Sequence, residues 1–167
     1  MTIAEFDHLS EAEKREQLFK CCGSSHWVDM MLAVFPVEDL VDLLQYADEK
    51  WLQCNEQDWL EAFTHHPKIG DKSSLKEKFA TTASWASNEQ SGVSTASDDV
   101  IEALAKGNED YEKKFGFIFI VCATGKSAEE MLGLLMARLP NDPDKEIRIA
   151  AEEQGKITAI RLNKLFA

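Results

Sequence analysis

Signals for the start of a helix recur along most of this 167-residue chain, and they limit it to a largely helical fold. The segments 10–13 and 127–130 each begin with Ser and end with Glu. This is the spacing of a capping box, in which two side chains satisfy backbone N–H groups of the first helical turn. Apolar residues follow the start signals at helical spacing. The segments expected to be helical are 10–22, 25–32, 38–53, 55–63, 97–108, 127–139 and 143–165.

One segment does not fit a wholly helical pattern. Residues 115–122 read Phe-Gly-Phe-Ile-Phe-Ile-Val-Cys, an aromatic and β-branched run that local propensity assigns to a buried strand. No other segment has comparable β character, so such a strand would have no partner. Either this run is extended within a helical core, or packing makes it helical.

The charge balance argues against two classes of ligand. Lysine and arginine total 18 against 30 aspartates and glutamates, giving a formal net charge of −12. Nucleic acids and anionic membranes both require clustered cations, so neither is an expected partner. A small anionic substrate is compatible with the sequence if the charge of its pocket opposes the overall field. The length and the ordinary composition predict one globular domain.

The cysteines and the N-terminal residues indicate a cytoplasmic protein. No stretch approaches 18 apolar residues, and the first residues are acidic where a secretion signal would be basic. The four cysteines show no C-x-x-C spacing. They are expected to be free thiols in a reducing compartment.

The segment His65-His66-Pro67 places two imidazoles where a helix must end. Pro67 disfavours the helical conformation of the residue before it, so His66 is expected at the end of a rigid element with its ring directed off the helix. A side chain that titrates near neutral pH suits acid–base chemistry from such a corner. The alternative is an ordinary structural His-Pro turn.

Two further groups have both a functional and a structural interpretation. Glu89-Gln90 lies in a polar stretch and could supply a carboxylate base with a binding amide, or it could be a solvated loop. Arg161 shares a helical stripe with Gln154 and Ile157, so it is expected to point inward. An inward Arg binds a carboxylate either of a ligand or of the protein itself.

Metal and phosphate sites are not expected. Glu61, His65 and His66 lie close in sequence, but their spacing matches no zinc pattern and no further ligand is evident nearby. The segment 124–127, Thr-Gly-Lys-Ser, lacks the earlier glycine of a phosphate-binding loop, so it is expected to begin a helix.

Taken in order, the motifs of the whole chain resemble those of the OHCU decarboxylases, which act on 2-oxo-4-hydroxy-4-carboxy-5-ureidoimidazoline in urate breakdown. Each motif is weak alone, but their order and coverage together are specific. The matching segments are 21–24 with Trp27, 58–63, 66–71, Trp85, 89–90, 115–121, 123–127, 138–139 with Asn141, 153–154, 156–157 and 161–162.

The resemblance implies a fold, an activity and a site. The fold would be all-α, a single domain over residues 1–167 with about eight helices, and the protein would be a homodimer that uses no cofactor and no metal. The activity would be stereospecific decarboxylation of the small-molecule substrate to S-allantoin. His66 and Glu89 would be the catalytic pair. The residues implied to bind substrate are Pro67, Ser87, Gln90, Phe119, Ile120, Val121, Cys122, Ala123 and Arg161.

Two other functions are compatible with the same residues. One is a hydrolase or isomerase of another ureido compound on the same helical fold, and the other is a helical interaction module without catalysis. Loss of turnover in His66 and Glu89 variants distinguishes the decarboxylase from both.

Overall fold

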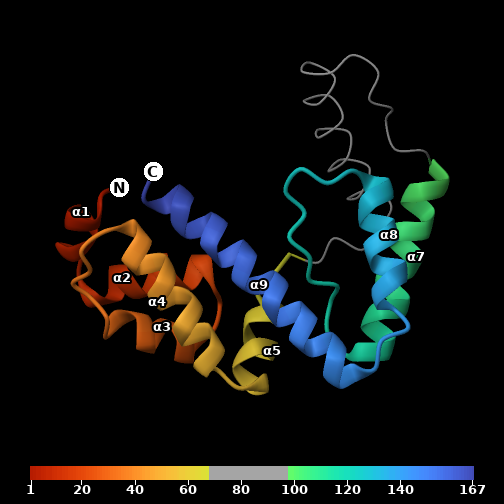
Figure 1. Cartoon of the computed structure of the whole chain (residues 1–167), viewed down its shortest axis with the longest axis horizontal. Helices are drawn as coiled ribbons and strands as arrows, with labels where there is room; N and C mark the ends of the chain where they lie inside the picture. Colours follow the sequence, from red (N-terminus) through yellow and green to blue (C-terminus); the bar gives the residue numbers. More distant parts are fainter. Residues whose placement is uncertain (68–97) are drawn as a thin grey trace, which may run out of the picture. The chain divides into compact units, whose positions relative to one another are not determined.

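The computed structural model describes residues 1–67 and 98–167. These residues contain eight helices and no strand, which confirms the predicted all-α fold with about eight helices (Figure 1). They divide into two compact units. The first unit comprises Met1–His66, Ile120–Cys122 and Ile147–Ala167, and the second comprises the described residues of Pro67–Phe119 and Ala123–Glu146. None of the described helices is long and apolar enough to cross a membrane.

Short helices with capped N-termini build most of the first unit. Its helices are α1 (Ile3–Asp7), α2 (Glu11–Cys21), α3 (Ser25–Leu32), α4 (Leu40–Gln53), α5 (Glu56–Thr64) and the part of α9 (Pro143–Leu165) from Ile147 onward. The capping boxes at Ser10 and Asn55 are formed. Helix α3 covers the predicted residues 25–32, and its N-cap is the buried Ser24. Helix α1 was not predicted; Thr2 caps it with a third capping box.

Two tryptophans connect the core of the first unit through their indole N–H groups. Trp27 of α3 is fully buried and donates to the carbonyl of Ala47 in α4 at 3.0 Å. Trp51 of α4 donates to the carbonyl of Ala151 in α9 at 2.7 Å. Each indole therefore buries a large apolar surface and also satisfies a polar group inside the core. The same core contains Phe6, Leu18, Val28, Met31, Leu43, Phe63 and Leu162.

The second unit pairs α7 (Asp98–Phe115) with α8 (Ala128–Arg138), and the two helices run in the same direction (Figure 1). A parallel pair requires a return segment about as long as the helix. At ~1.5 Å per residue α7 spans about 27 Å, which an extended segment of about a dozen residues covers easily. Residues 116–127 contain neither helix nor strand, so the extended alternative for the aromatic run is correct. Gly107 lets the helices approach, since a Cβ there would lie 2.5 Å from Leu135 Cδ2.

A buried carboxylate organises the polar interior of the second unit. Glu146, in the first turn of α9, is fully buried and its Oε1 accepts hydrogen bonds from Tyr111 Oη at 2.5 Å and Arg138 Nε at 2.6 Å. Its Oε2 accepts from Asn141 Nδ2 at 3.0 Å. Burial and this hydrogen bond raise the pKa of the Tyr111 phenol. The paired charges compensate one another in a place that water does not reach.

Removing the charge of Glu146 should cost substantial stability. In Glu146→Gln the Arg138 guanidinium is left buried without its counterion, so we expect the free energy of unfolding to fall by roughly 3 kcal/mol in urea titrations. Glu109→Gln is the matched control, because Glu109 pairs with Lys113 on the exposed surface of α7, and it should leave the urea midpoint unchanged. Equal midpoints for both variants would contradict a structural role for the buried pair.

Candidate functional site

His66 lies at the end of α5, as predicted. The His65 N–H donates to the carbonyl of Ala62, and the His66 N–H donates to the carbonyl of Phe63 at 3.3 Å. The helix ends there because Pro67 disfavours its continuation. The imidazole of His66 is half-buried in the first unit, while Pro67 is exposed. A rigid helix end therefore holds the ring.

A buried amide of α9 fixes the orientation of the His66 ring. His66 Nε2 is hydrogen-bonded to Oε1 of Gln154, which is fully buried. The Thr158 hydroxyl donates to the backbone carbonyl of Gln154 at 3.0 Å, so it can only accept from the Gln154 Nε2 amide at 3.1 Å. The amide oxygen consequently faces the imidazole, and Nε2 of His66 must carry a proton. In the neutral ring, Nδ1 is the atom with the free lone pair.

Arg161 lies about two turns beyond Gln154 on the same stripe of α9. It contacts the C-terminal end of α2. Its Nη1 donates to the carbonyls of Lys20 and Cys21, both at 3.4 Å. A cation at this position is favoured by the helix dipole. Arg161 is half-buried, as its stripe predicted, but within the described residues its hydrogen bonds go to backbone carbonyls rather than to a carboxylate.

The surroundings of His66 favour the neutral imidazole. Burial lowers its pKa below the usual 6.5; the hydrogen bond with Gln154 opposes this shift, and the positive charge of Arg161 adds to it. The unfolded chain therefore binds a proton more readily than the folded chain. Stability contributed by His66 is present at neutral pH and is lost as the pH falls from about 6.5 through the folded pKa.

The segment 120–122 also belongs to the first unit. Ile120 and Cys122 are buried. The backbone N–H of Cys122 donates to Oε1 of Glu153 at 3.1 Å, and the other carboxylate oxygen of Glu153 accepts from Lys156 at 2.5 Å. Glu153 of α9 thus anchors the extended segment, and the two α9 neighbours Glu153 and Gln154 hold separate parts of the predicted site.

The remaining predicted residues lie elsewhere. Phe119 and Ala123 belong to the second unit, as does Pro67. The ring of Phe119 contacts that of Tyr111 at a centroid distance of 5.2 Å and lies under the Arg138 guanidinium. The first unit therefore contains His66, Ile120, Val121, Cys122 and Arg161. Ser87, Glu89 and Gln90 lie outside the described residues.

Glu61, His65 and His66, which were considered as metal ligands from the sequence, have different partners in the structure. The Glu61 carboxylate accepts from the backbone N–H and the hydroxyl of Ser25, at 2.8 and 2.7 Å. The ring of His65 packs edge-on against Phe19 and is so close to Gly23 that a Cβ there would lie 2.7 Å from the Cβ of His65. His65 is therefore a packing residue.

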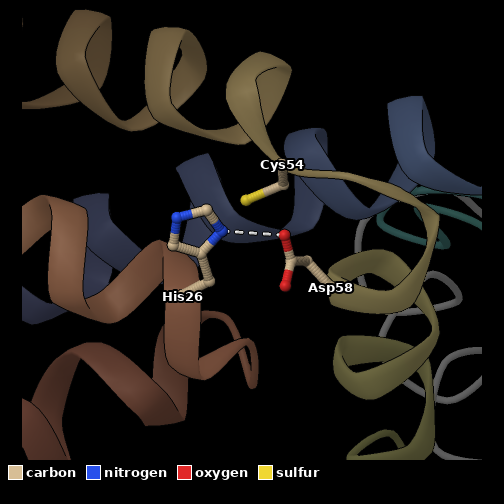
Figure 2. Close-up of side chains that lie close together, drawn as sticks. All are labelled: His26, Cys54 and Asp58. Atoms are coloured by element: carbon tan, nitrogen blue, oxygen red, sulfur yellow. Dashed lines mark hydrogen bonds and ion pairs between the residues drawn. The ribbon is translucent and has the colours of Figure 1, made fainter.

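A different group of metal-ligating side chains does converge. His26, Cys54 and Asp58 place one ligand atom each within 4.8 Å of the others, and they are the one such trio among the described residues (Figure 2). They come from the first turn of α3, the C-cap of α4 and the first turn of α5. No sequence pattern indicates this group, because His26 lies far from the other two residues in the chain. The neighbouring Cys54 and Asp58 were the only local signal.

The first unit also has a cavity of about 690 Å³ that contains none of the predicted site residues. It is lined mainly by side chains of α4 and α9, among them Trp51 and Ala151, with Trp59 of α5. Of its two indoles, Trp51 belongs to the core already described and Trp59 is half-buried.

Comparison with known proteins places these features in context. The family model described as OHCU decarboxylase matches residues 7–163. The uric acid degradation bifunctional protein TTL of Arabidopsis thaliana is 41% identical over 149 residues, which cover 88% of this chain and 45% of that protein. The 2-oxo-4-hydroxy-4-carboxy-5-ureidoimidazoline decarboxylase of Amia calva is 32% identical over 101 residues, 60% of this chain and 57% of that one.

A solved structure is similar in both fold and sequence. It is a crystal structure of OHCU decarboxylase in the presence of (S)-allantoin, with a TM-score of 0.72 and 40% identity, covering 89% of this chain and 95% of that chain. The chain spans about half the length of the two curated relatives, 45% and 57%.

Removing the positive charge of Arg161 should raise the pKa of His66. In Arg161→Met the imidazolium no longer faces a like charge, so an NMR titration of the His66 ring should have its midpoint at higher pH than in the parent protein. The resonance is assigned by its loss in His66→Gln. Lys164→Met, at an exposed position of the same helix, is the control and should leave the midpoint in place. An unchanged midpoint in Arg161→Met would show that this charge does not act on the ring.

Proposed function

Since the chain belongs to the OHCU decarboxylase family, we propose that it decarboxylates 2-oxo-4-hydroxy-4-carboxy-5-ureidoimidazoline to S-allantoin without a cofactor. The observation that carries this proposal is the environment of His66. A half-buried imidazole, oriented by Gln154 and kept neutral by burial and Arg161, is available as a base at neutral pH.

The substrate supplies its own electron acceptor. It carries a carboxylate and a hydroxyl on one ring carbon, next to a C=N bond. As carbon dioxide leaves, the bonding pair forms a new C=C bond and the imine pair moves to nitrogen, which takes up a proton from solvent. The hydroxyl then loses its proton to become the carbonyl of allantoin, and the neighbouring ring carbon gains one. The sum is uptake of one proton and release of one carbon dioxide.

We assign the hydroxyl proton to Nδ1 of His66. Nε2 is occupied by its hydrogen bond to Gln154, so the lone pair of Nδ1 is the basic one. Glu89 is proposed as the partner that handles the proton at the neighbouring carbon, on the family resemblance. Delivery of that proton to one face of the ring sets the S configuration.

Arg161 is proposed to bind a ring or ureido carbonyl of the substrate. A guanidinium that held the departing carboxylate would stabilise the ground state and oppose the reaction. Its Nη1 contacts with the α2 carbonyls are long, at 3.4 Å, and a guanidinium has five N–H donors in all.

The other proposed contacts follow the family resemblance. They are Pro67, Ser87, Gln90 and the backbone of Phe119, Ile120, Val121, Cys122 and Ala123. In that segment the Cys122 N–H already donates to Oε1 of Glu153.

We also propose that residues 1–167 form one domain, because the family model runs over both units. A homodimer in the cytoplasm is proposed from the family resemblance and from the four free cysteines, all of which are buried.

The activity is tested by circular dichroism of allantoin formed in solution. Uricase and the following hydrolase generate the unstable substrate in the cuvette, where it decays unaided to racemic product. Addition of this protein should produce a rapid S-allantoin signal, and His66→Ala should reduce the rate by at least about a hundredfold, as expected for loss of a general base. Glu89→Gln should have an effect of similar size.

The matched control for that assay is His65→Phe. It removes the neighbouring imidazole and keeps an aromatic ring against Phe19, so the signal should be retained. A racemic trace at the spontaneous rate from folded parent protein would overturn the decarboxylase proposal. If His65→Phe lost the signal and His66→Ala kept it, the catalytic imidazole would be that of His65, which would contradict the assignment to His66.

The role of Gln154 is tested by the pH profile of Gln154→Glu. A carboxylate against Nε2 favours the imidazolium, so the pKa of His66 rises and the acidic limb of kcat/KM should move to higher pH by one or more pH units. Gln154→Ala should lower activity at all pH values because the ring loses its orientation. If the acidic limb of the pH profile stayed in place in Gln154→Glu, residue 154 would not act on the pKa of the catalytic imidazole.

A further inference from the structure

Three chemically different ligand groups meet where helices α3, α4 and α5 come together. His26 Nδ1 lies 2.8 Å from Asp58 Oδ2, and the Cys54 sulfur points toward this pair (Figure 2). Cys54 is buried, and the side chain of Asp58 is 16% exposed. The side chain of His26 is 51% exposed, which leaves an open side toward solvent. The fold therefore fixes Cys54 and Asp58, and the more exposed His26 lies on the solvent side of the group.

The Cys54 thiol and the Asp58 carboxylate are poorly matched to one another without a cation. Burial and the nearby negative charge of Asp58 together raise the pKa of Cys54 to about 12, against a hydrogen bond with Ser24 that lowers it. The thiol stays protonated and donates a hydrogen bond to the Lys50 carbonyl, with a sulfur–oxygen distance of 3.4 Å. A divalent cation between sulfur and carboxylate would stabilise the thiolate that the Asp58 charge otherwise disfavours.

We propose that His26, Cys54 and Asp58 form a binding site for a borderline-soft divalent cation, with Zn²⁺ as the best fit. One nitrogen, one thiolate and one carboxylate are ligands that zinc accepts, and water from the exposed side completes a tetrahedron. Thiolate excludes the hard cations Mg²⁺ and Ca²⁺ as preferred occupants. A thiolate and a carboxylate also neutralise the charge of the ion.

The distances require only small movements. With metal bonds of about 2.0 to 2.3 Å, neighbouring ligand atoms of a tetrahedron are about 3.3 to 3.7 Å apart. The three ligand atoms already lie within 4.8 Å of one another. The nitrogen and oxygen separate slightly, and the sulfur moves inward. The ion takes the place of the proton between His26 and Asp58, and His26 carries its proton on Nε2 instead.

The supporting hydrogen bond is present as well. Asp58 Oδ2 accepts from the backbone N–H of Asn55 at 3.0 Å as part of the capping box of α5. That bond orients the carboxylate in the way outer-sphere partners orient metal ligands. Binding converts the Cys54 thiol to a thiolate and releases its proton to solvent, so the affinity should increase with pH.

The experiment uses Co²⁺ as a spectroscopic probe of the purified protein, treated beforehand with a chelator. Bound Co²⁺ should give a thiolate-to-cobalt absorption band in the near ultraviolet, which equimolar Zn²⁺ removes. Cys54→Ser should abolish the band, and His26→Gln and Asp58→Asn should each weaken Zn²⁺ binding at least about tenfold. Asp58→Asn keeps a side-chain oxygen for the cap, and His26→Gln alters an exposed side chain, so both variants should fold.

Matched controls exist for both residue types. Every cysteine and histidine of the chain is described, so Cys122→Ser and His8→Gln test a thiol and an imidazole elsewhere in the first unit. Both should keep the band. Zn²⁺ should also raise the melting temperature of the parent protein and of these controls, but not that of Cys54→Ser. No band in the parent protein, or a band that survives in Cys54→Ser, would overturn the proposal.

Discussion

The ends of helices are the constraint on which most of this structure depends. Every helix leaves four N–H and four C=O groups without a partner inside the helix, and short helices have many ends for their length. Polar side chains answer this need throughout the described residues. Ser24 is fully buried in order to cap α3, Asp58 completes the cap of α5, and Arg161 covers the carbonyls at the end of α2. Of the groups with a proposed function, Asp58 and Arg161 satisfy helix ends in this way, and His66 lies at the end of α5.

The capping of helix ends by nearby side chains explains which parts of the fold could be predicted from the sequence. Capping boxes and helical periodicity are local, so the starts at Ser10, Asn55 and Ser127 could be read directly. The aromatic run 115–122 could not be assigned, because its conformation depends on the parallel packing of α7 and α8, which is not local. The N-terminal α1 was missed; it is only five residues long.

In the candidate site, too, the local features could be predicted and the long-range contacts could not. The His66-Pro67 turn and the inward position of Arg161 follow from neighbouring residues, and both were expected. The contact of His66 with Gln154 joins positions 88 residues apart, and the contact of His26 with Asp58 joins positions 32 apart. Neither pair has a sequence signal of its own. Gln154 shares a stripe with Arg161, which would have been the available clue.

The first unit has one consequence for the order in which the protein can be made. Its core includes the indole of Trp51 and the carbonyl of Ala151, which are 100 residues apart in the chain. During synthesis, helices α1 to α5 leave the ribosome well before α9 exists. Until then the nascent chain has Trp51 and His66 without their α9 partners. Truncation within α9 would leave the protein in this state permanently. On every newly made chain, a chaperone would encounter the surface around Trp51 and His66 that α9 later contacts.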